Sequence, residues 1–155
     1  MCAAVCGAQF PILKGKTMLQ QSITESSVRE LVDRFYARVQ EDAVLGPVFN
    51  KILAGRWETH MPRMIAFWTK VLVGTGEFQG NVFGKHMALQ GIEKEHFVRW
   101  LALFRLTAVE VFGIEQAASA IAVAERIAMS LQLGFFGEIV TGRPEFLQKA
   151  SEMSR

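Results

Sequence analysis

Cysteine is scarce in this chain of 155 residues, and its two cysteines, Cys2 and Cys6, both lie at the N-terminal end. They are far from every histidine and outside the periodic part of the sequence, which argues against a zinc site and against a disulfide framework. Thiols without such roles are typical of a reducing compartment, so we expect a cytoplasmic protein.

The chain also lacks a basic cluster and a long apolar run near its start. Lys and Arg number 17 against 15 Asp and Glu, and no basic stripe is present that would neutralise phosphates, which argues against a nucleic-acid partner. Residues 1–13 are apolar, but they have no basic start region and are broken by Gly7, Gln9 and Pro11. This stretch is too short to cross a bilayer, so we expect no membrane partner and a loose extension over residues 1–22.

No part of the main body alternates between apolar and polar residues over a useful length, and no internal repeat or low-complexity tract is evident. The sequence therefore predicts an all-α protein. The glycine-rich stretch 74–76 follows a helical segment and lacks the Lys-Ser or Lys-Thr of a nucleotide-binding loop. It is interpreted as a turn.

Helical periodicity begins near Ile23. Ser27 and Glu30 have the spacing of a capping box, and the pattern runs to about Asp42, where Leu45-Gly46-Pro47 is expected to end the helix. The positions expected to face the core on this helix are Val28, Leu31, Val32, Phe35, Tyr36 and Val39.

Four further helices are predicted: residues 60–73, 83–90, 94–112 and 115–133, with Gly134 as the terminator of the last. Pro62 complicates the first of these, because a helix that begins there would leave His60 in the preceding loop. The helical domain then spans residues 23–134, with a tail over 135–155. The inward positions expected on the 60–73 helix are Met64, Phe67, Trp68, Val71 and Leu72.

Aromatic and sulfur side chains are plentiful, with 12 Phe, 3 Trp and 7 Met, which is enough for one compact domain. Flat or pliable side chains on the inward faces are suited either to an ordinary packed core or to lining a slot for a planar ligand. His86 stands alone on an apolar helical face, where a histidine is either a haem-iron ligand or, more often, a structural group without a metal. The side chains in this expected lining are Phe35, Tyr36, Phe49, Met64, Phe67, Trp68, Phe83, Phe97, Trp100 and Phe104.

Several short motifs, in their order and spacing between Ile23 and Leu133, resemble those of truncated haemoglobins, specifically the third group of that family. The motifs are Phe35-Tyr36, Leu45-Gly46-Pro47-Val48-Phe49, Trp57-Glu58-Thr59-His60, Phe67-Trp68, Phe78-Gln79-Gly80-Asn81, His86, and His96-Phe97-Val98-Arg99-Trp100-Leu101.

This resemblance implies a two-over-two helical sandwich around haem b. By position, His86 matches the proximal histidine, whose Nε2 binds the iron while its Nδ1–H donates to a backbone carbonyl in the preceding turn. Tyr36 and Trp100 match the distal donors to a bound ligand. His60 matches the distal or gate histidine, which donates to the ligand, swings toward solvent, or binds the iron itself.

The resemblance also suggests how the rest of the haem is held. Arg63 and Lys85 are candidates for the propionates, which need cations at the pocket mouth. His96 is expected to be structural. The proposed haem-packing residues are Phe49, Met64, Phe67, Trp68, Phe83, Met87, Leu89 and Phe97.

The implied function is the binding of dioxygen, nitric oxide or carbon monoxide at a five- or six-coordinate haem iron. Three polar distal groups also favour redox chemistry, such as nitric oxide dioxygenation or peroxide reduction, which would need an external reductase. Two alternatives remain open from the residues alone: a haem-free globin-like module that binds an apolar ligand or a partner, and a zinc hydrolase built on His60, His86 and His96. The physiological ligand and the oligomeric state stay open.

Overall fold

The structure, a computed structural model, describes residues 22–139, and every regular element in that range is a helix. This confirms the predicted all-α class. The expected N-terminal extension and the tail beyond Ile139 lie outside the described residues, apart from Ser22. The helices are α1 (Glu25–Glu41), α2 (Leu45–Ile52), α3 (Trp57–Leu72), α4 (Val82–Met87), α5 (Lys94–Phe112) and α6 (Ile114–Phe136).

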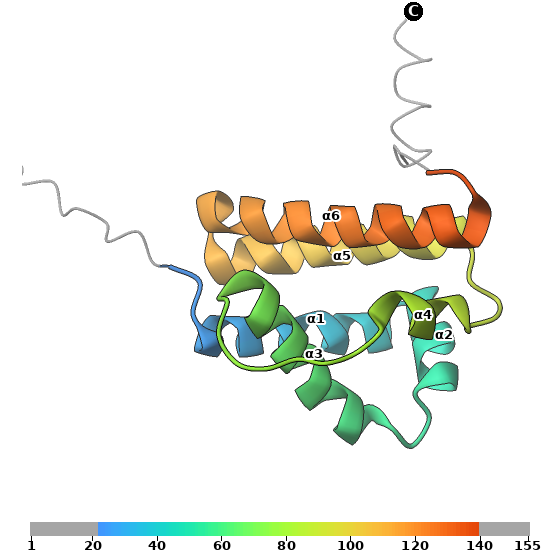
Figure 1. The fold of residues 1–155 in the computed structure, drawn as a ribbon, viewed down its shortest axis with the longest axis horizontal. Coiled ribbons are helices and arrows are strands. Elements are labelled where there is room, and N and C mark those ends of the chain that lie inside the picture. Colours follow the sequence, from blue (N-terminus) through green and yellow to red (C-terminus); the bar gives the residue numbers. More distant parts are fainter. Residues whose placement is uncertain (1–21, 140–155) are drawn as a thin grey trace, which may run out of the picture.

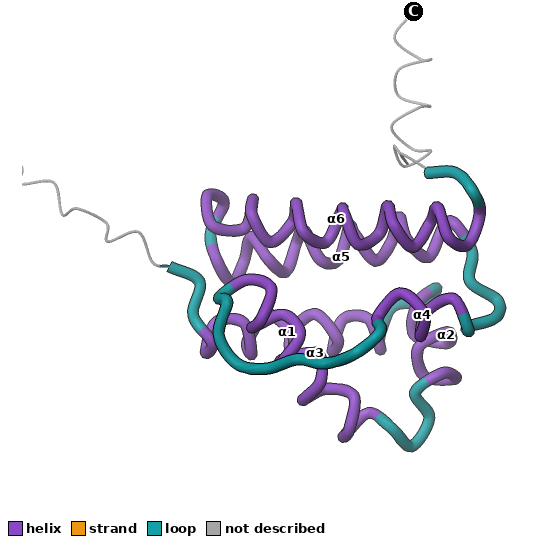
Figure 2. Tube along the Cα trace, in the orientation of Figure 1, coloured by secondary structure: helices purple, strands orange, loops and turns teal. Residues whose placement is uncertain are grey.

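Two pairs of helices form two layers (Figure 1). Helices α5 and α6 lie side by side in one layer, and α1 with α3 forms the other, with α1 packed against α5. The short helices α2 and α4 contact α1 and α6 respectively. Figure 2 shows the long loop between α3 and α4, which carries the chain across the molecule to α4.

Helix α1 buries its predicted face. The six residues expected to point inward are all buried, which confirms the periodicity argument. The predicted cap was wrong, because the helix begins one turn earlier. Thr24 Oγ1 accepts from the Ser27 backbone N–H at 3.2 Å, and Ser27 Oγ accepts from the Thr24 N–H at 2.9 Å. Glu30 instead pairs with Arg34 on the exposed face.

Helix α2 was not predicted, since Leu45-Gly46-Pro47 was expected to end a helix and in fact begins one. The carboxylate of Asp42 starts it, because its Oδ1 accepts the backbone N–H groups of Val44 and Leu45, each at 2.9 Å. Gly46 permits the sharp change of direction after α1. A Cβ there would lie 2.6 Å from the Gln40 carbonyl oxygen, closer than a side-chain carbon can approach.

Helix α3 begins at Trp57 and contains Pro62 in its interior. His60 therefore lies on the helix, which answers the question that Pro62 raised. Val71 was expected to face inward but is 41% exposed. It lies in the last turn of α3, where an exposed loop follows and few neighbours remain to cover it.

Helix α5 has the predicted bounds, and a single residue, Gly113 with φ 79°, joins it to α6. The predicted stop at Gly134 was wrong, because α6 continues to Phe136 and ends at Gly137, which has φ 69°. Within the described residues, α6 is the one helix long and apolar enough to cross a membrane by length and composition. Part of that apolarity is a face of buried alanines that packs in the core.

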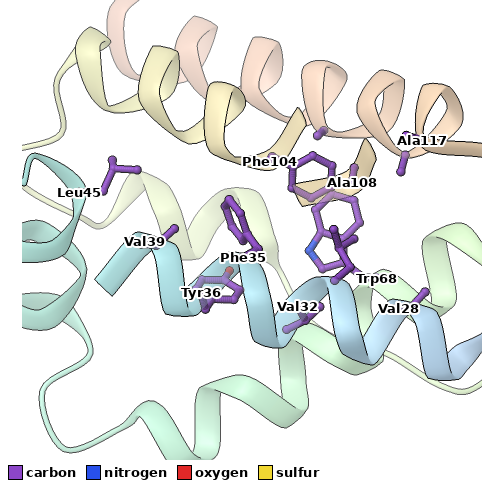
Figure 3. Close-up of a cluster of buried hydrophobic side chains, with 13 residues drawn as sticks. Val28, Val32, Phe35, Tyr36, Val39, Leu45, Trp68, Phe104, Ala108 and Ala117 are labelled. Carbon is purple, nitrogen blue, oxygen red and sulfur yellow. The ribbon is translucent and has the colours of Figure 1, made fainter. Parts of the chain in front are cut away.

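The core lies between the two layers. Figure 3 shows Phe35 of α1, Trp68 of α3 and Phe104 of α5 together in this cluster. Their rings pack at centroid distances of 5.4 Å for Phe35 with Phe104 and 4.8 Å for Trp68 with Phe104. Such aromatic pairs add to the hydrophobic effect by about 0.5–1.5 kcal/mol each. The cluster fixes α1, α3 and α5 relative to one another.

Candidate functional site

A cavity of about 450 Å³ opens beside this core, a size within the range of small-molecule and cofactor sites. Its walls are mostly apolar and are contributed by all six helices. Most of the residues predicted for the site line this cavity: Tyr36, Phe49, His60, Arg63, Met64, Phe67, Trp68, Lys85, His86, Leu89, Phe97 and Trp100.

Two residues predicted to pack against a ligand do not line the cavity. Phe83 is 46% exposed, and both it and Met87 lie against Gly134 of α6, on another face of α4. Phe35 and Phe104, also expected in the lining, are 1% exposed and pack in the core behind it. These side chains support the wall of the site instead of forming its surface.

His86 lies on α4, whose first turn is capped by the Asn81 side chain, an acceptor for the Gly84 N–H at 2.8 Å. The Nδ1 atom of His86 lies 2.7 Å from the carbonyl oxygen of Val82, one turn earlier. Because a carbonyl only accepts hydrogen bonds, the ring hydrogen belongs on Nδ1. The contact confirms the predicted bond to the preceding turn and leaves Nε2 with a free lone pair on a ring that lines the cavity.

His60, on the first turns of α3, lines the same cavity. Its Nε2 is buried and has no hydrogen-bond partner within residues 22–139. Burial lowers the pKa of His60 below its usual 6.5, and electrostatic interactions with His86, Arg63 and Arg56 lower it further. The imidazole is therefore neutral near pH 7, with one polar atom left unsatisfied at the site.

Tyr36 reaches the cavity from α1, with its ring edge-on to His60 at a centroid distance of 5.6 Å. Burial raises the pKa of the Tyr36 hydroxyl, so the group keeps its proton at any physiological pH. Trp100 enters from α5 and is held by a stacked contact with Phe104 at 5.4 Å and 16°. Both side chains line the cavity and carry a hydrogen-bond donor.

Three cations border the cavity. Arg63 and Lys85 were predicted there, and Arg56 was not. Arg56 directly precedes α3 and donates from Nη2 to the Ile52 carbonyl oxygen at the end of α2. Their positive charges suit an anionic group such as a carboxylate.

Sequence reasoning missed a second set of lining residues, all of them apolar. Those on α2 and after it were missed because α2 itself was not predicted, and those on α6 because nothing in the alanine-rich pattern marks which face meets a ligand. The missed apolar lining residues are Leu45, Val48, Ile52, Leu53, Phe78, Val82, Ile92, Ile127, Ala128, Leu131 and Phe135.

His96 also borders the cavity, but its Nδ1 accepts the backbone N–H of Glu93 at 3.0 Å, which completes the cap of α5. The described residues contain no group of three or more His, Cys, Asp or Glu side chains close enough to hold a metal ion. A zinc centre built on His60, His86 and His96 is therefore wrong.

Comparison with known proteins places this geometry in a family. No family model matches the sequence. The chain is similar to the group 3 truncated hemoglobin ctb of Campylobacter jejuni, with 30% identity over 115 residues that cover 72% of this chain and 91% of that protein. It is also similar to the crystal structure of a group III truncated hemoglobin from Campylobacter jejuni, with a TM-score of 0.69, 30% identity, and the same 72% and 91% coverage.

The residues of the cavity fit a haem. A mostly apolar slot suits the macrocycle, a histidine with an oriented and available Nε2 suits the iron, and cations at the wall suit the propionates. The Nε2 atom of His60 is buried without a hydrogen-bond partner, and a polar atom of a bound ligand would supply one. The chain therefore belongs to the group III truncated haemoglobins, a family of globin-type haem proteins that bind small ligands.

Proposed function

We propose that this protein binds dioxygen, nitric oxide and carbon monoxide at the iron of haem b, with His86 as the proximal ligand and Tyr36, His60 and Trp100 as distal donors. The bound haem would supply a redox-active iron with a coordination position for a diatomic molecule. The observation that carries the proposal is the hydrogen bond between His86 Nδ1 and the Val82 carbonyl.

That hydrogen bond has two effects on His86. It fixes the orientation of the ring, because α4 and its capped first turn hold the Val82 carbonyl in place. It also makes Nε2 a better electron donor, since a carbonyl that accepts the Nδ1 hydrogen increases the basicity of the ring. Both effects are those that a histidine ligand to iron requires.

The distal residues combine three donors of different kinds. The Tyr36 hydroxyl keeps its proton because burial raises its pKa, and the Trp100 indole N–H only donates. His60 is neutral and carries its unsatisfied Nε2 at the same cavity. Donors held in a partly dry site stabilise negative charge that develops on a ligand.

Such a site holds dioxygen tightly and favours redox use over rapid release. We therefore extend the proposal to nitric oxide dioxygenation or a peroxidase-like reaction in the cytoplasm, with electrons from a separate reductase. The cations Arg56, Arg63 and Lys85 are the side chains available to pair with the haem propionates.

The test is the rate of dioxygen release, measured together with nitric oxide consumption, in the parent protein and in Tyr36→Phe. Removing one donated hydrogen bond worth about 1–1.5 kcal/mol should speed release roughly tenfold. Phe112→Leu is the matched control, because Phe112 is half-buried against the core and does not line the cavity. An unchanged release rate in Tyr36→Phe would remove Tyr36 from the distal site.

A further inference from the structure

Trp57 lies outside the cavity lining, yet it contacts two of the distal side chains. Its ring centroid is 6.0 Å from that of Tyr36, at 70°, and 6.1 Å from that of His60, at 86°. Tyr36 and His60 contact each other at 5.6 Å and 89°. The three rings therefore meet pairwise, each pair edge to face, which is a favourable arrangement for aromatic groups.

In the first turn of α3, the Arg56 carbonyl oxygen accepts the backbone N–H of His60 at 2.9 Å and that of Thr59 at 3.2 Å. Trp57 is the first residue of α3, whose N-cap, Arg56, makes no side-chain capping bond. Pro62 has no N–H, so the carbonyl of Glu58 receives no hydrogen bond from the position four residues on. None of these backbone bonds involves the His60 ring, which contacts Tyr36 and Trp57.

We propose that Trp57 is a positioning residue that holds the His60 imidazole in place at the cavity, an inference that rests on the distal role given to His60 above. Trp57 and His60 are three residues apart, so they lie on one face of α3 and their side chains meet. To turn toward solvent, the His60 ring must give up its contacts with both Trp57 and Tyr36. Trp57 thereby sets the fraction of molecules in which Nε2 faces the ligand.

This role differs from that of Tyr36, which touches the same ring. Tyr36 is 5% exposed and is fixed by Phe35 and Phe49 at 5.1 and 6.2 Å, so it stays in place when His60 moves. Trp57 is half-buried and shares its short, uncapped turn with His60. A change at position 57 should therefore act on His60 and leave the Tyr36 hydroxyl where it is.

The experiment is acylation of histidine by diethyl pyrocarbonate in the haem-loaded protein, followed residue by residue with mass spectrometry. The buried His60 Nε2 should react slowly in the parent. We expect several-fold faster acylation of His60 in Trp57→Ala and a rate close to that of the parent in Trp57→Phe, which keeps an aromatic edge. His96 serves as the internal control in every sample and should not change.

Parent-level acylation of His60 in Trp57→Ala would overturn the proposal. Equal acceleration at His60 and His96 would also overturn it, since that pattern means general loosening. If Trp57→Ala fails to fold, Trp57→Leu, which keeps an apolar side chain without the ring, decides between the same outcomes. Carbon monoxide binding by the parent is measured in parallel. If the parent does not bind carbon monoxide, the proposed function is wrong. The acylation pattern tests the role of Trp57 independently of that result.

Discussion

Arg99 of α5 holds Asp42 with two hydrogen bonds, from Nε to Oδ1 at 3.0 Å and from Nη2 to Oδ2 at 2.5 Å. The same carboxylate caps the start of α2 through the N–H groups of Val44 and Leu45. The Asp42 side chain, which is 8% exposed, thus joins α5 to the junction between α1 and α2. Phe49, which lines the cavity, lies on the helix that this carboxylate starts.

Replacing Asp42 with Asn should remove the ion pair and keep most of the cap, because an asparagine oxygen also accepts at a helix start. We expect the free energy of unfolding to fall by about 1–2 kcal/mol at neutral pH, with Arg99 partly exposed and its charge screened. Denaturant titration measures the loss. Glu30→Gln, which breaks the exposed Glu30–Arg34 pair, should change stability far less.

The acid dependence of that loss provides a further check. The Arg99 guanidinium lowers the pKa of Asp42 to about 2, from 3.8 in an ordinary aspartate. Since the folded pKa is the lower one, the stabilisation is complete above about pH 4 and disappears as the pH falls toward 2. The stability difference between the parent and Asp42→Asn should shrink over that interval, and a constant difference would contradict this account.

His60 should make stability depend on pH in a different range. Burial lowers its pKa below 6.5, so the unfolded chain takes up a proton at a higher pH than the folded chain does. The free energy of unfolding should therefore fall as the pH drops from neutrality through that range. In His60→Gln this contribution is absent, and denaturant titrations at several values between pH 7 and 5 should show a shallower decline.

Replacing His86 with Gly should abolish the proximal bond while leaving the helices in place. The Soret absorption should be lost or strongly shifted, and millimolar imidazole should restore it by filling the space of the missing ring. Far-UV circular dichroism establishes that the variant is folded. If the parent protein takes up no haem at all, the result would instead favour the alternative of a haem-free globin-like binding module.

Gly134 sets how closely α4 approaches α6. A Cβ there would lie 2.6 Å from Met87 Sδ and 2.8 Å from Phe83 Cζ. Because these are the far ends of side chains, Gly134→Ala should be nearly neutral, its gain in helix propensity of about 1 kcal/mol offsetting the adjustment. Gly134→Leu should cost about 1–3 kcal/mol, displace α4 and speed haem loss severalfold. Ala122→Leu, at an exposed position of α6, is the control.

The sequence predicted the long helices well because their apolar period is sustained. Helix α5 has its predicted bounds, and α1 buries its predicted face. Helix α2 was missed because Pro47 was treated as a breaker. It is the third residue of α2, where the backbone N–H has no helical partner in any case, so proline carries no penalty there.

The site was predicted less completely, for reasons of geometry. Helix α4 has only six residues, too few for periodicity to show that Phe83 and Met87 face α6 while His86 faces the cavity. The contact of Trp57 with Tyr36 brings together two helices, and no local pattern encodes it. The position of Arg56 at the cavity could not be predicted either, because it depends on how the end of α2 meets the start of α3.

The single-residue link at Gly113 bears on how the protein acquires its shape. Closing so short a connection costs little chain entropy, and contacts between neighbouring segments form quickly. We expect the α5–α6 hairpin to assemble ahead of α1 and α3. Trp100 of α5 and Leu131 of α6 both line the cavity. Part of the cavity wall would therefore be formed before the folding chain binds its prosthetic group.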